Sequence, residues 1–88
     1  MKVYGVYDSK AGAFNMPFYM QNAGMALRVF VQTAKDPNTS LNKFPSDFIL
    51  FELGEFEERT GEFKNHDKQV NLGSAASHLS PAVVKEEK

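Results

Sequence analysis

The stretch FELGEFEERTGEF, residues 51–63, alternates apolar residues with acids and then changes phase at Gly54. Alternation with a period of two is typical of a half-buried β-strand. One extra residue at Gly54–Glu55 would return Phe56 to the face that Leu53 occupies, as a β-bulge does, and glycine is a favoured bulge residue. We therefore predict a bulged hairpin with its aromatic rings on the dry face and its glutamates on the wet face and tip.

The segment EERTG closes this hairpin, because Gly61 can adopt the left-handed conformation that ends a short loop. The returning strand runs from Glu62 to Val70. Opposite charges that face each other across an antiparallel pair are favourable. We expect Glu57 to pair across the hairpin with Lys64 or Lys68.

The N-terminal half predicts a strand pair followed by a helix. Lys2–Tyr7 is rich in valine and tyrosine and predicts a strand, and residues 8–12 have turn chemistry. Ala13–Met20 predicts a second strand that Pro17 confines to a sheet edge or breaks. Asn22 is the expected N-cap of an amphipathic helix that ends at the DPN sequence. The helix has one broad apolar stripe: Ala23, Ala26, Leu27, Phe30, Val31 and Ala34.

The rest of the chain completes an α+β fold. A polar loop over residues 38–47 carries Leu41 and Phe44 as apolar anchors. Phe48–Leu53 predicts a central strand, apolar on both faces where it begins. A short helical turn begins near Ser74. We predict a small, mostly antiparallel β-β-α-β-β sheet with one amphipathic helix packed on it, a single domain over residues 1–80, and a flexible tail over 81–88.

Composition excludes several classes of site and partner. The 88 residues contain no cysteine, which excludes disulfides and thiolate metal sites. The N-terminal segment has no apolar run of signal-peptide length, so we expect a soluble intracellular protein that does not engage membranes. The net charge of −1 argues against a generic polyanion binder. Residues 47–62 hold six acids and one base, whereas the remainder holds nine bases and five acids, a net of +4.

No pattern in the sequence predicts catalysis, a metal site or a cofactor. Glu52, Glu55 and Glu57 could bind a magnesium ion, but solvation of a strand face explains them as well. His66 and His78 lack the further nitrogen or sulfur ligands of a zinc site. No glycine-rich phosphate loop or nucleophile elbow is present. We expect a protein that is not an enzyme.

Bases interleaved with tyrosines form the most informative set. Proteins that bind single-stranded nucleic acid combine positive side chains, which contact the backbone, with aromatic rings, which stack on bases. In the alternative interpretation the tyrosines belong to the sheet or an interface and the lysines are scattered. The candidate nucleic-acid-binding residues are Lys2, Tyr4, Lys10, Tyr19, Arg28, Lys35, Lys43, Lys64 and Lys68.

Self-association is a third possibility. Eight phenylalanines, an edge strand and an exposed tyrosine face suit a small domain that forms a homo-oligomer. An acidic hairpin on a basic body could also bind head to tail.

Three blocks of sequence resemble a known family: MKVYGVYDSKAGAFNMPF (1–18), GMALRVFVQTAKDPNT (24–39) and FPSDFILFELGEFEERTGEF (44–63). Their order and spacing resemble the small nonstructural protein of gokushovirus-type microviruses, which are single-stranded DNA phages. The likeness covers Met1–Gly73, and the VVKEEK tail lies outside it.

The resemblance implies a nonstructural phage protein of the host cytoplasm that binds single-stranded DNA and aids genome replication or packaging. It carries no catalytic motif with it. A different function stays open, in which the acidic hairpin is a protein-interaction module that grips a phage or host protein and does not bind nucleic acid.

Overall fold

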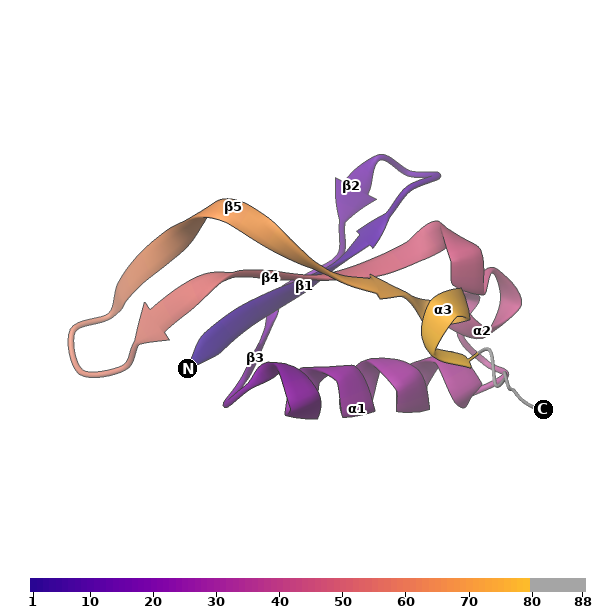
Figure 1. Ribbon diagram of the computed structural model, residues 1–88, viewed down its shortest axis with the longest axis horizontal. Helices are drawn as coiled ribbons and strands as arrows, with labels where there is room; N and C mark the ends of the chain where they lie inside the picture. The colour runs from indigo at the N-terminus through magenta and orange to yellow at the C-terminus, as the bar shows by residue number, and fades with distance from the viewer. Residues whose placement is uncertain (80–88) are drawn as a thin grey trace.

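An antiparallel sheet with a long helix on one face forms the body of the protein (Figure 1). The computed structural model describes residues 1–79. The predicted α+β class is confirmed. The strands run in the order β2-β1-β4-β5, and β3 also pairs with β1. The elements are β1 (Lys2–Asp8), β2 (Ala13–Phe14), β3 (Phe18–Met20), α1 (Ala23–Lys35), α2 (Ser40–Lys43), the 3₁₀ turn η1 (Pro45–Asp47), β4 (Phe48–Glu57), β5 (Glu62–Ser74) and α3 (Ala75–Leu79).

The break predicted at Pro17 is present. β2 and β3 both pair antiparallel with β1, and the residues between them make no strand. Proline has no N–H to donate to a ladder, so the chain leaves the sheet there and returns at Phe18. Gly12, at φ 69°, supplies the left-handed turn between β1 and β2, and its N–H donates to the Asp8 carbonyl.

Helix α1 begins and ends as the sequence predicts. The Asn22 side chain accepts a hydrogen bond from the Met25 N–H and caps the first turn, and Asp36 is the C-cap. The apolar stripe faces the sheet, so that Ala26, Phe30 and Ala34 are buried. They pack in one core with Tyr4, Leu41, Phe48, Leu50 and Ala75.

The polar loop expected over residues 38–47 contains two short helical segments, α2 and η1. Thr39 caps α2 by accepting from the Asn42 N–H. The prediction of Leu41 as an anchor is confirmed, since it is buried in the core, but that of Phe44 is wrong, since its side chain is 58% exposed. Phe44 is the C-cap of α2, directly after its last turn, and lies outside the buried core that Leu41 joins.

Strand β4 carries the predicted bulge, one residue earlier than the sequence indicated. Val3 pairs with Gly54 and Tyr4 with Glu52, so Leu53 is the extra residue opposite β1. Glycine is required next to it, because a Cβ at Gly54 would lie 2.3 Å from the carbonyl oxygen of Lys64.

The charge pairing predicted across the hairpin is wrong. Glu57 faces Glu62, and Lys64 faces Glu55. The loop spans residues 58–61, so Glu57 and Glu62 are the residues that flank it, and the register brings these two acids together at the tip. Gly61 has the expected positive φ of 76°.

Helix α3 begins directly after Ser74, where a helical turn was predicted, and the Ser74 hydroxyl accepts from the Ser77 N–H. The flexible tail predicted for residues 81–88 lies outside the described residues. Among residues 1–79, no helix is both long enough and apolar enough to cross a membrane.

Candidate nucleic-acid interface

The sheet has two chemically different faces. Helix α1 covers one of them, while the β1–β2 turn rises from the other (Figure 1). Cross-strand partners share a face, and Val3 pairs with Tyr19, as Gly5 does with Phe51. We call the side away from α1 the helix-free face. Its side chains are mainly aromatic and apolar: Val3, Tyr7, Phe14, Tyr19, Phe51, Leu53, Phe56 and Phe63.

Two aromatic clusters lie on the helix-free face. The first, on the projecting hairpin, joins Phe56 to Phe63 with ring centroids 4.8 Å apart and to Tyr19 at 5.8 Å. The bulge therefore returns Phe56 to the predicted face, where it is half-buried. The ring of Phe63 is 62% exposed and that of Tyr19 42%. The face expected to be dry thus presents two rings to solvent.

The second cluster lies over the centre of the sheet. Phe14 is 5.1 Å from Tyr7 and 5.7 Å from Phe51, centroid to centroid. Gly5 makes this possible, because a Cβ there would lie 2.9 Å from Leu53 Cδ1 and 3.1 Å from Phe14 Cδ1. Phe14 is 38% exposed, so one part of its ring can contact a ligand.

A hollow of about 660 Å³ adjoins Phe14. Asn15 and Pro17 border it from the β2–β3 connection, and Leu53 borders it from β4. Strand β5 supplies the remaining wall. The β5 lining residues are Asn65, His66, Asp67 and Gln69.

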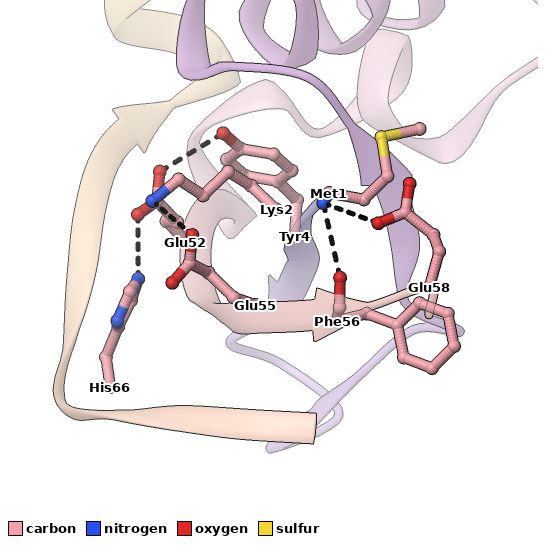
Figure 2. A network of polar contacts seen from close by, with 8 residues as sticks. All are labelled: Met1, Lys2, Tyr4, Glu52, Glu55, Phe56, Glu58 and His66. Atoms are coloured by element: carbon pink, nitrogen blue, oxygen red, sulfur yellow. Dashed lines mark hydrogen bonds and ion pairs between the residues drawn. The ribbon is translucent and has the colours of Figure 1, made fainter. Parts of the chain in front are cut away.

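A polar network links three strands beside this hollow (Figure 2). Glu52 accepts a hydrogen bond from the Tyr4 hydroxyl at 3.1 Å, and its other oxygen lies 2.7 Å from His66 Nε2. Burial, the hydrogen bond to Glu52 and the negative charge of Glu52 together raise the pKa of Tyr4 to about 12. The carboxylate thereby holds β5 against β4 and β1.

Two further carboxylates of the hairpin pair with positive groups of Met1 and Lys2 (Figure 2). Lys2 Nζ lies 3.1 Å from Glu55, and its hydrogen bond and charge lower the pKa of that carboxyl. Glu58 lies 3.3 Å from the Met1 amine. The pKa of Glu58 is lowered by a hydrogen bond from its own backbone N–H and by that amine. Lys2 is therefore already paired with an acid.

The hairpin tip is acidic. A hollow of about 600 Å³ there is lined by four glutamates together with Met1, Phe56, Phe63 and Lys64; the glutamates are Glu55, Glu57, Glu58 and Glu62. Within residues 1–79, Glu57 and Glu62 form no ion pair. The negative potential of this hollow would repel phosphate, so a strand that stacks on Phe63 would have to keep its backbone outside the hollow.

The predicted binding residues do not gather on one surface. Arg28 and Lys35 lie on the exposed side of α1, and Lys43 ends α2. Lys10 lies in the β1–β2 turn, and Lys64 and Lys68 lie on β5. Among the predicted tyrosines, Tyr19 alone is on the helix-free face with an exposed ring.

Tyr4 is a correction to the predicted set. Its side chain is 0% exposed, and its ring packs in the core with Phe30 and Leu50. A ring without exposed surface offers no plane to a base, so Tyr4 is a structural residue. The alternation of β1 correctly places Tyr4 and Lys2 on one face, but α1 covers that face.

The sequence reasoning missed Phe14 and Phe63 as candidate stacking residues. Phe63 was predicted to lie on the dry face of the hairpin, and Phe14 was predicted only as part of an edge strand. Their positions next to turns were the available signal, since such positions are covered on fewer sides. Among residues 1–79, no three histidine, aspartate or glutamate side chains group closely enough to hold a metal ion.

Comparison with known proteins places the chain among bacteriophage proteins. A family model described as Phage ORF5 protein matches residues 1–78. No curated protein and no solved structure matches the chain. The family match spans both aromatic clusters, the hairpin and α1. The chain belongs to the Phage ORF5 protein family.

Proposed function

We propose that this phage protein is a non-catalytic, nonstructural factor that binds single-stranded DNA in the host cytoplasm without strong sequence preference, aiding genome replication or packaging. The observation that carries the proposal is that both aromatic clusters of the helix-free face present rings to solvent: Phe14, Tyr19 and Phe63. Exposed aromatic rings on an open sheet are the usual stacking platform for unpaired bases. The resemblance of residues 1–73 to the small nonstructural protein of gokushovirus-type microviruses supports the same role.

Two bases on segments that adjoin these rings would contact the DNA backbone. Lys10 lies in the turn that leads into Phe14, and Lys68 lies in the segment of β5 that walls the central hollow. Neither forms an ion pair within residues 1–79. Each phosphate that a lysine neutralises releases a counterion, so binding should weaken as salt rises. With few such contacts, we expect a shallow salt dependence and an affinity that depends mainly on stacking.

Fluorescence anisotropy with a labelled single-stranded oligonucleotide at low and moderate salt tests the proposal. Phe63→Ala should weaken binding by about 1–3 kcal/mol, the usual contribution of one stacked base. Replacing both Lys10 and Lys68 with alanine should weaken binding to all sequences and flatten its salt dependence. The matched control is Phe44→Ala, because Phe44 is a similarly exposed phenylalanine, 58% against 62%, that lies outside the helix-free face.

Three results would overturn the proposal: no binding at low salt, binding that does not respond to salt, or equal losses for Phe63→Ala and Phe44→Ala. Equal losses would mean that any exposed ring contributes in the same way and that the helix-free face has no special role.

A protein-interaction function is the alternative that one observation favours. Glu57 and Glu62 face each other at the tip without an ion pair among the described residues, an arrangement that costs stability. A positively charged partner would relieve that repulsion. In this case reversing the charges of Glu57 and Glu58 should abolish capture of the partner and leave DNA binding unchanged.

We infer also that the protein forms a homo-oligomer. Helix α1 carries Arg28 and Lys35 on its exposed side and no acid, and these bases make no ion pair within residues 1–79. Their Cα atoms lie about 10 Å apart along the helix axis. Met25 and Val29, 46% and 38% exposed, lie beside them. The tip of a second copy offers the complementary charge through Glu57 and Glu62.

A further inference from the structure

The central hollow exists because β5 arches away from β4. Glu52 pairs with Val70 and Gly54 with Asn65, so one residue of β4 lies opposite four residues of β5. We call residues 66–69 the β5 arch. The arch and the β2–β3 connection form opposite walls, and Leu53 lies between them. The hollow is therefore a consequence of strand register.

Two contacts fix the arch where it begins, and the pairing of Glu52 with Val70 closes it where it ends. The His66 ring is 2.7 Å from Glu52, whose side chain is 16% exposed and also accepts from buried Tyr4. Next to His66, the backbone of Lys64 and Asn65 passes so close to Gly54 that no side chain would fit at that glycine. A wall held in this way needs little ordering when a ligand enters, which favours binding.

The lining suits a neutral, flat ring with polar edges. Phe14 contributes an aromatic surface, and the amides of Asn15, Asn65 and Gln69 each offer donors and an acceptor. No lysine or arginine lines the hollow, and Asp67 is acidic, so a phosphate group is disfavoured there. A volume of about 660 Å³ lies within the usual range of small-molecule sites, ~300–1,000 Å³.

We propose that this hollow takes one unstacked base of a bound single strand and prefers a base with an exocyclic amino group. The inference rests on the proposed function and adds a preference at one position. Phe14 stacks on the base, and the amides bind its edge. Amide groups can turn to match either amino or carbonyl groups, but the Asp67 carboxylate only accepts, so it selects an amino group such as that of cytosine.

The test compares binding of oligodeoxycytidine and oligodeoxyuridine of equal length, since the two bases have one ring size and differ in the groups on the pairing edge. The wild-type protein should bind oligodeoxycytidine at least about fivefold more tightly. Asp67→Asn should remove that difference, because an amide can also donate to the carbonyl of uracil. Phe14→Leu should weaken the binding of both oligomers and leave the ratio of their affinities unchanged. Asp67 and Phe14 are both exposed in part, so neither substitution disturbs the core.

Gln69→Ala should reduce the preference, whereas Gln32→Ala, which removes an exposed amide on α1, should not. Equal binding of the two oligomers by the wild type, or an unchanged preference in Asp67→Asn, would overturn this inference and leave the proposed function standing. Failure to bind either oligomer would overturn both.

Discussion

His66 Nε2 lies 2.7 Å from one oxygen of Glu52, while the other oxygen of Glu52 accepts the Tyr4 hydroxyl at 3.1 Å. One carboxylate thus joins a core residue of β1 to the start of the β5 arch. The same contacts that complete the core also shape the hollow on the opposite side of the sheet. Fold stability and the candidate site are therefore coupled through Glu52.

The burial of Tyr4 and its contacts with Glu52 predict that this tyrosine ionises at an unusually high pH. Burial and the contacts with Glu52 raise the pKa of Tyr4 from 10.0 to about 12 in the folded protein. A raised pKa means that the stabilisation is complete below pH 10.0 and is lost as the pH rises toward 12. An absorbance titration should show a phenolate step near pH 12 that Tyr4→Phe removes. A titration of Tyr4→Phe with the same shape as that of the wild type would contradict this.

The bulge should depend on the absence of a side chain at Gly54. A Cβ there would lie 2.3 Å from a backbone oxygen, which cannot move without displacing β5. We expect Gly54→Ala to lower the free energy of unfolding in urea by about 3 kcal/mol.

Gly12→Ala is the matched control. A Cβ at Gly12 would meet nothing within 4 Å, so this substitution should destabilise the protein only through its left-handed backbone conformation, by about 1 kcal/mol. Similar losses for the two variants would show that β5 does not close on Gly54.

The sequence predicted those strand and helix boundaries that depend on interactions between residues close together in the chain. Asn22 and Pro17 mark boundaries through capping and a missing donor, and the phase change near Gly54 revealed the bulge. The burial of Tyr4 could not be predicted, because both faces of β1 carry a tyrosine and the packing of α1 selects one. The β5 arch was also missed, since it depends on Glu52 meeting His66 across a gap of fourteen residues.

The Lys2–Glu55 pair predicts acid sensitivity. Lys2 lowers the pKa of Glu55 below its ordinary value of 4.5. A lowered pKa in the folded state gives stability that is present above pH 4.5 and lost as the pH falls through the folded value. The melting temperature of Lys2→Met should therefore decline less than that of the wild type between neutral pH and pH values below 4.5. Parallel declines would show that the pair does not contribute.

Complementary charge reversals test the proposed self-association. Glu57→Lys with Glu62→Lys should make the protein monomeric, because two basic surfaces then meet. Arg28→Glu with Lys35→Glu should do the same through two acidic surfaces. Sedimentation should show that the two variants associate when mixed, since each then carries the surface that the other needs. A mixture that stays monomeric, or single variants that still associate, would rule out head-to-tail contact.

The position of the DNA-binding surface is most directly tested by following backbone amide NMR signals while a single-stranded oligonucleotide is added. We predict that the largest shifts occur on the helix-free face, around Phe14, Tyr19 and Phe63 and along the β5 arch, with little change on the exposed side of α1. Shifts that centre on Arg28 and Lys35, or no shifts at all, would contradict binding through the open face of the sheet.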